Sequence, residues 1–104
     1  MSIATKLTDS LVKLQGSVDS SNAHQFEEEL LAAISGQALT LDAEELTYIS
    51  SAGLRVLLKA KKTLGEDIVI INVNPEVFEI LDMTGFTQIF TVWIVLSSDV
   101  TMKE

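Results

Sequence analysis

The sequence contains no cysteine, so disulfide bonds and thiolate metal sites are excluded. Basic residues are few: 7 Lys and Arg stand against 15 Asp and Glu, which gives a formal net charge of -8. This excess of negative charge argues against nucleic-acid backbones and anionic membrane surfaces as partners. Long hydrophobic runs are also missing. The longest, residues 68–71 and 92–96, fall far below the ~20 residues needed to cross a bilayer, so we expect no membrane insertion.

The usual signatures of catalysis are missing as well. The only histidine, His24, is predicted on a helix surface with no spacing that would bring it to a serine. The sequence has no Gly-x-x-x-x-Gly-Lys-(Ser/Thr) loop, and its acidic residues do not follow calcium-loop spacing. We therefore expect no enzyme activity, no cofactor and no metal. The first residues lack a basic region followed by an apolar core, so we expect no signal peptide and a cytoplasmic protein.

The stretch from residue 39 to residue 64 organises the chain. A short apolar run is followed by a predicted polar bend at Asp42, Glu44 and Glu45, and a second apolar run ends in Ser50 and Ser51. A helical pattern of leucines then begins, so a strand is predicted to end in a serine pair that opens a helix. Serine is a preferred N-cap, and a free helix N-terminus attracts negative charge. An anion attached to one of these hydroxyls would meet unpaired N–H groups.

Residues 49–54, Ile-Ser-Ser-Ala-Gly-Leu, resemble the signature loop of STAS domains, the family of bacterial anti-sigma factor antagonists. In that family a strand runs into Asp-Ser-(Ser/Thr)-Gly-Leu, and the first serine is phosphorylated. Ser51 matches the phosphorylated serine, Gly53 the glycine and Leu54 the leucine. Ser50 stands where the family often has Asp, and Ala52 where it often has a second hydroxyl. The resemblance thus implies phosphorylation at Ser51, with Ser50 as the alternative.

A second segment carries the same resemblance. Six residues are similar to the family's Gly-x-Val-Asp-x-x-Asn-Ala-x-x-Phe pattern: Gly16, Val18, Asp19, Asn22, Ala23 and Phe26. In the family the matching Asp lies close to the phosphorylated serine, which makes Asp19 and Asn22 candidates for the partner-docking surface. From the residues alone, Asp19 is predicted to be a turn residue, and Asn22 is predicted to form a capping box with Gln25 three positions later. The two interpretations are compatible.

Basic residues gather on the helix after Ser51. Arg55, Lys59 and Lys62 follow at i, i+4 and i+7, and Lys61 adds charge near the end of the helix. The stripe is either a solvated face that suits the negative end of the helix dipole or a docking edge for an acidic patch on a partner. Arg55 is the best placed for docking, since it lies one turn from Ser51.

The remaining pattern predicts a hairpin in residues 3–14, a helix from Ala23 that ends near Gly36, and a strand in residues 67–73 covered on both faces. Asn74 is expected to cap a helix with Pro75 at its first position, and Gly85 to stop it. A last strand is expected in residues 91–96. The resemblance to STAS domains implies a terminal helix after it, and because residues 97–104 are few and polar we expect that helix to be short or frayed. This order predicts one α/β domain, residues 1–104, with a mixed sheet of about five strands, an N-terminal antiparallel hairpin and packed helices, as in the STAS fold.

The resemblance implies an anti-sigma factor antagonist. Unphosphorylated, it would bind an anti-sigma factor that is also a serine kinase. That kinase would phosphorylate Ser51, and a PP2C-type phosphatase would reset it. The implied contact residues are Asp19, Asn22, Ser50, Ser51, Ala52, Gly53 and Arg55. Two alternatives remain: a STAS subunit that regulates a membrane transport ATPase or permease, and a nucleotide- or small-ligand-binding STAS module. The second ranks last because no phosphate loop is present.

Overall fold

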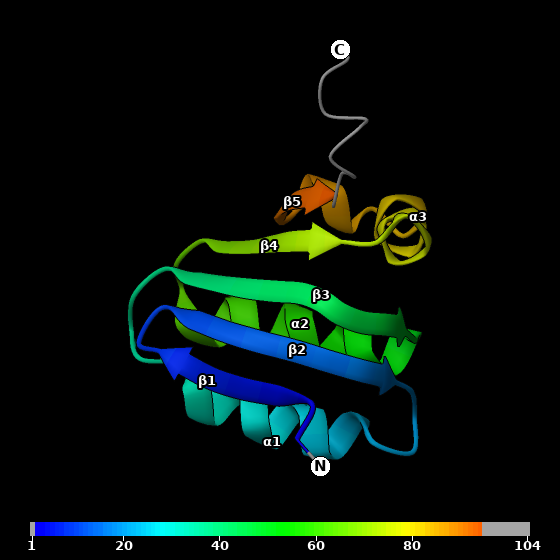
Figure 1. Ribbon diagram of the computed structural model, residues 1–104. Helices are drawn as coiled ribbons and strands as arrows, with labels where there is room; N and C mark the ends of the chain where they lie inside the picture. Colours follow the sequence, from blue (N-terminus) through cyan, green and yellow to red (C-terminus); the bar gives the residue numbers. More distant parts are fainter. Residues whose placement is uncertain (1, 95–104) are drawn as a thin grey trace.

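A computed structural model describes residues 2–94 and contains the predicted mixed five-stranded sheet (Figure 1). The strands lie in the order β1-β2-β3-β4-β5. Strand β1 pairs antiparallel with β2, and the remaining neighbours all pair in parallel. The elements are β1 (Ala4–Thr8), β2 (Leu11–Val18), α1 (Ala23–Ala33), β3 (Leu39–Ile49), α2 (Ser51–Leu64), β4 (Ile68–Val73), α3 (Pro75–Met83), the 3-10 helix η1 (Phe86–Gln88) and β5 (Thr91–Ile94). This architecture confirms the fold class predicted from the sequence.

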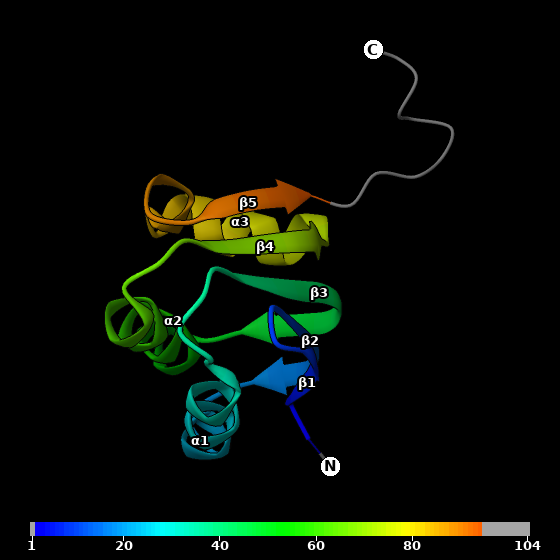
Figure 2. The same cartoon turned by 90° about the vertical axis from the view of Figure 1, so that its left-hand side faces the viewer.

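Helices α1 and α2 lie side by side on one face of the sheet (Figure 2). They bury apolar residues that recur every third or fourth position, such as Phe26 and Leu30 on α1 and Leu54 and Leu57 on α2. Opposite them, alternate residues of β2 and β3 are buried in the same core. Helix α3 packs against β3 and β5. Within residues 2–94, none of the helices combines the length and the apolar character needed to cross a membrane.

Strand β2 is longer than the hairpin pattern indicates. The pattern ends it near Leu14, whereas it continues to Val18, which is paired with Ile49 of β3. Gly16 lies within the extension at a φ of 82°, which favours glycine, and the register between β2 and β3 shifts between Gly16 and Ser17. The extension depends on pairing with β3, a contact that a local pattern does not contain.

The predicted bend at residues 42–45 is wrong, because this segment belongs to β3. The register changes from Lys13 opposite Asp42 to Gln15 opposite Glu45, so β3 carries one extra residue, a β-bulge. The Asp42 carboxylate accepts a hydrogen bond from the Glu44 N–H inside the bulge (3.0 Å) and one from Asn72 Nδ2 on β4 (3.1 Å). The acidic residues therefore lie on a strand, and sheet pairing overrides their local preference for a turn.

The continuous apolar run of β4 predicted a strand covered on both faces, but the two faces are not covered equally. Ile68, Ile70 and Val73 are buried, whereas Val69 and Ile71 are only half-buried. The helices of the described chain therefore shield the second face only in part. Register between β4 and β5 shifts near Asn72, whose φ is 58°.

Most helix boundaries follow the local signals. Gly65 ends α2 in the left-handed conformation with a φ of 71°, and its N–H donates to the Lys61 carbonyl at 3.0 Å. Asn74 caps α3 as predicted: its Oδ1 accepts the Val77 N–H at 2.8 Å, with Pro75 at the first helical position. Helix α1 ends at Ala33, slightly before Gly36. The predicted end of the last strand at residue 96, and the expected terminal helix in residues 97–104, lie outside the described residues.

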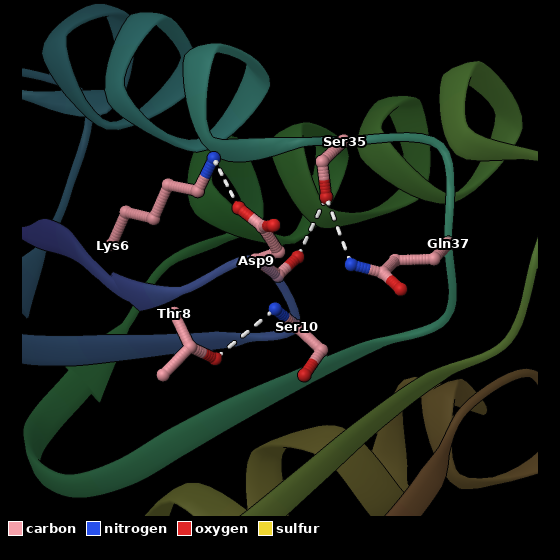
Figure 3. A network of polar contacts seen from close by, with 6 residues as sticks. All are labelled: Lys6, Thr8, Asp9, Ser10, Ser35 and Gln37. Carbon is pink, nitrogen blue, oxygen red and sulfur yellow. Dashed lines mark hydrogen bonds and ion pairs between the residues drawn. The ribbon is translucent and has the colours of Figure 1, made fainter.

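A polar network fixes the end of the sheet where β2 and β3 begin (Figure 3). Ser35 lies just after α1, and its hydroxyl donates a hydrogen bond to the Asp9 carbonyl in the β1–β2 turn at 2.6 Å. Lys6 forms an ion pair with Asp9 at 3.5 Å, and Gln37 Nε2 donates to the Ser35 hydroxyl at 3.5 Å. The network joins the hairpin turn to the segment that leads into β3, at the opposite end of β3 from Ser50 and Ser51.

Candidate functional site

The two motif segments meet at the carboxyl ends of β2 and β3. Val18 and Ile49 are paired across the parallel strands, and the Ser50 N–H donates to the Val18 carbonyl at 2.8 Å. Asp19 directly follows Val18, and Ser51 directly follows Ser50. Parallel strands bring their carboxyl ends to one edge of the sheet, where residues on different loops can form a common surface. The structure therefore places Asp19 and the serine pair at one edge.

The two serines have different environments. Ser50 is the N-cap of α2, half-buried, with extended backbone (φ -90°, ψ 177°), and its hydroxyl accepts the Gly53 N–H at 3.5 Å. Ser51 is the first residue of α2 and is exposed; its hydroxyl makes no hydrogen bond with another residue in the described part of the chain. The first N–H groups of a helix have no intrahelical acceptor, so an anion on Ser51 would lie beside unpaired donors.

Gly53 is buried, and its role in this structure is close packing. A Cβ atom at this position would lie 2.6 Å from Ile49 Cγ1 and 2.8 Å from Val18 Cγ1. The first turn of α2 can therefore approach the ends of β2 and β3 only with glycine here. Because Gly53 is buried, it exposes little surface to a partner and supports the neighbouring contact residues by packing.

Asp19 holds the turn between β2 and α1. Its Oδ1 accepts hydrogen bonds from the Ser21 hydroxyl (2.5 Å) and the Ser21 N–H (2.8 Å). These bonds, first the one from the Ser21 hydroxyl and then the one from the Ser21 N–H, lower the pKa of Asp19 from its ordinary value and outweigh the opposing effect of burial. Asp19 is thus an ionised, locally bonded turn residue beside the serine pair. Ser21 was not singled out from the sequence, although its position two residues after an Asp is typical of an Asx turn.

The capping box predicted for Asn22 does not form. The Asn22 Oδ1 accepts the Asp19 N–H at 2.9 Å, and its Nδ2 donates to the Ser17 carbonyl at 2.9 Å. The side chain therefore bonds backward to the turn instead of forward to the first turn of α1. Asn22 still marks the start of the helix, since its carbonyl accepts the Phe26 N–H at 3.0 Å. It shapes the turn that carries Asp19.

The basic residues of α2 are mostly exposed, but they differ in their neighbours. Lys59 is bonded to Glu27 of α1, and this hydrogen-bonded ion pair lowers the pKa of the Glu27 carboxyl. The Lys61 ammonium lies 5.8 Å from the centre of the Phe90 ring, within cation–π range. Arg55 and Lys62 are exposed and, within the described residues, pair with no acidic side chain. Of these two cations, Arg55 is the one near Ser51, whereas Lys62 lies near the other end of α2.

The described surface also carries a hollow and an exposed histidine. A hollow of about 450 Å³ lies at the far end of α2, lined by Leu58, Lys61, Lys62, Gly65, Glu66, Asp67 and Ile89. His24 is exposed on α1, and its Nε2 lies 3.2 Å from Oε2 of Glu28. Among residues 2–94, no three His, Cys, Asp or Glu side chains are grouped so as to hold a metal ion.

Comparison with known proteins places the chain in a family. The family model described as "Mlab, STAS domain" matches residues 1–96. A protein of Bordetella bronchiseptica, provisionally named anti-sigma factor antagonist BtrV, is 43% identical over 84 residues, which cover 76% of this chain and 72% of the relative.

Solved structures share the fold at low sequence identity. An anti-sigma factor antagonist from Mycobacterium paratuberculosis superimposes with a TM-score of 0.72 at 20% identity, over 97% of this chain and 91% of the other. The anti-sigma factor antagonist SpoIIAA in its unphosphorylated form superimposes with a TM-score of 0.67 at 14% identity, over 95% of this chain and 90% of the other. The two sequence motifs, the observed topology and these matches agree, and the chain belongs to the STAS domain family of anti-sigma factor antagonists.

Proposed function

We propose that this protein binds an anti-sigma factor that is also a serine kinase, and that phosphorylation of Ser51 ends this binding. The observation that carries the proposal is the position of Ser51: it is exposed and first in α2, and its hydroxyl bonds to no other residue within 2–94. Ser50 is the weaker candidate because its hydroxyl faces the Gly53 N–H as an N-cap. The family to which the chain belongs and the name of the BtrV relative support the choice of partner.

The proposed reaction is a phosphoryl transfer from ATP held by the kinase. Ser51 Oγ attacks the γ-phosphorus, and a new O–P bond forms as the bond from that phosphorus to the β,γ-bridging oxygen breaks. ADP leaves, and a base on the kinase takes the hydroxyl proton. A PP2C-type phosphatase would later hydrolyse the phosphoserine ester. In this scheme the protein is the substrate and needs no catalytic group or cofactor of its own.

The charge added by phosphorylation explains why partners would separate. A phosphoserine carries about -1.5 to -2 charges near neutral pH. At the N-terminus of α2 this charge meets unpaired N–H groups and the positive end of the helix dipole, so the fold is expected to survive. At an interface, the same charge must lose water and face the partner's acidic groups. We propose local repulsion, not refolding, as the basis of the switch.

The proposed contact surface comprises the residues around Ser51 that retain accessible surface: Asp19, Asn22, Ser50, Ala52 and Arg55. Asp19 and Asn22 come from the turn after β2, whereas the others come from the start of α2. This surface combines an ionised carboxylate with an exposed guanidinium. A partner with complementary charges would bind it in one preferred orientation.

Capture of partners from native cell extract would test the proposal. The unphosphorylated protein should retain a protein that, with ATP, places phosphate on Ser51, mapped by mass spectrometry after proteolysis. Ser51→Ala should retain the same protein and accept no phosphate, and Ser50→Ala should still be phosphorylated. Phosphate on Ser50 alone would move the site by one residue. Retention of a transport ATPase without phosphate transfer would favour the membrane-transport alternative, and binding of ATP or GTP by the isolated protein in a titration would favour the ligand-binding one.

A further inference from the structure

Most basic side chains of this acidic protein are already engaged. In residues 2–94, four of them interact with a neighbour: Lys6 with Asp9, Lys13 with Glu45, Lys59 with Glu27, and Lys61 with the Phe90 ring. The other two in this part of the chain are Arg55 and Lys62, which are exposed and make no ion pair. A cation left unpaired in a chain of net charge -8 is available for an anion from elsewhere.

Arg55 lies beside Ser51 on the surface of α2. The two residues are separated by four positions in a continuous helix, which places Cβ atoms about 5–6 Å apart on one face. Both are exposed, whereas Gly53 and Leu54, which lie between them in the sequence, are buried. An acidic group N-terminal to a basic one at this spacing is the more favourable order. Lys62, eleven positions after Ser51, is about 16 Å away along the helix axis.

We propose that the phosphate on Ser51 captures Arg55 as its counter-ion and thereby withdraws Arg55 from the partner. The guanidinium presents a planar fork of N–H donors that can bond two phosphate oxygens at once. In the unmodified protein, Arg55 is free to pair with an acidic group of the partner. Phosphorylation then has two effects on one surface: it adds repulsive charge and removes an attractive one. This inference rests on the proposed phosphorylation of Ser51.

The contact can be tested without a kinase, by installing phosphoserine at position 51 during translation. The second pKa of the phosphate is then measured by phosphorus NMR in the otherwise unchanged protein, in Arg55→Gln and in Lys62→Gln. The last variant removes the same charge from the same helix at a distance. Asp19, the other charged side chain placed at this edge, is unchanged in all three, and so is the effect of the helix N-terminus.

An adjacent guanidinium favours the dianionic phosphate, so its removal should raise the phosphate pKa. We expect a rise of about 0.5 in Arg55→Gln and a much smaller one in Lys62→Gln. Equal values in the two variants would overturn the capture. Since the phosphate is installed, this result does not depend on any kinase. A protein that shows the rise but is never phosphorylated in cells would contradict the proposed function alone.

Withdrawal from the partner has its own readout. Unphosphorylated Arg55→Gln should bind the captured anti-sigma factor several-fold more weakly than the unchanged protein, and its affinity should depend less on salt concentration. Lys62→Gln should bind as the unchanged protein does. Unchanged binding by Arg55→Gln would show that Arg55 makes no partner contact for the phosphate to remove, and would overturn this half of the proposal.

Discussion

Gly53 at the start of α2 packs directly against Val18 at the end of β2, and a Cβ atom on Gly53 would lie 2.8 Å from Val18 Cγ1. The Ser50 N–H also donates to the Val18 carbonyl, so this one strand end contacts both the cap and the first turn of the helix. The position of the Ser51 hydroxyl therefore depends on the absence of a side chain two residues later.

Gly53→Ala should destabilise the protein by about 1–3 kcal/mol, because the added methyl overpacks a site walled by Val18 and Ile49. Urea denaturation followed by circular dichroism measures the change. Ser51→Ala, on the exposed side of the same turn, is the matched control and should stay within about 0.5 kcal/mol of the original protein. A stable Gly53→Ala variant would show that the helix start can shift away from the strands.

Phosphorylation of Ser51 should lower affinity for the anti-sigma factor about 30- to 150-fold, equivalent to about 2–3 kcal/mol. Ser51→Asp carries less charge and should weaken binding less, whereas Ser51→Ala should bind constitutively. Calorimetric titration measures all three. Thr63→Asp is the control for Ser51→Asp, because it adds the same charge at an exposed position near the other end of α2, and it should leave affinity unchanged. If Thr63→Asp weakened binding as much as Ser51→Asp does, the effect would come from net charge and not from the position of the charge.

Glu29→Gln should destabilise the start of β1. The Glu29 Oε1 accepts the N–H groups of Ile3 (2.7 Å) and Ala4 (2.9 Å), and both bonds are stronger to a carboxylate than to an amide. We expect a loss of about 1 kcal/mol, reduced by solvent because the group is only partly buried. Glu28→Gln, on the exposed side of α1, is the control.

The same carboxylate should contribute to the pH dependence of stability. Burial alone would raise the pKa of Glu29, but hydrogen bonds from the Ala4 N–H, Gln25, the Ile3 N–H and Ser2 outweigh it and lower the pKa from its ordinary value of 4.5. The folded state therefore binds its proton less tightly than the unfolded state. The stabilisation is complete above pH 4.5 and is lost as the pH falls through the lowered pKa, so unfolding curves of Glu29→Gln and the original protein should converge in acid.

Asn72 should tolerate glycine better than valine. Its φ of 58° is accessible to Gly and Asn but strained for a β-branched residue, and its Nδ2 donates to Asp42. Asn72→Gly loses only the hydrogen bond, about 1 kcal/mol, whereas Asn72→Val should lose about 1–2 kcal/mol more from backbone strain. Thermal unfolding separates the two contributions. Equal losses would mean that β4 reverts to regular pairing when Asn72 is replaced.

The signals that depend on neighbouring residues were sufficient to predict much of this molecule. The capping of α3 by Asn74, the end of α2 at Gly65 and the opening hairpin follow from turn chemistry and hydrophobic period, which act within a few residues. The serine pair at the start of α2 was predicted for the same reason. Local rules cannot weigh one hydrogen-bond partner against another that is distant in sequence.

The tertiary structure decided what those local groups do. It turned the Asn22 amide back to Asp19 and Ser17, placed the acidic segment at residues 42–45 in a strand, and paired Lys59 with Glu27 across two helices while leaving Arg55 free. Each outcome depends on register and packing between segments far apart in the chain. The sequence by itself thus determined that a serine opens α2, but only the packing of α2 on β2 and β3 decided which serine hydroxyl caps the helix and which one faces solvent.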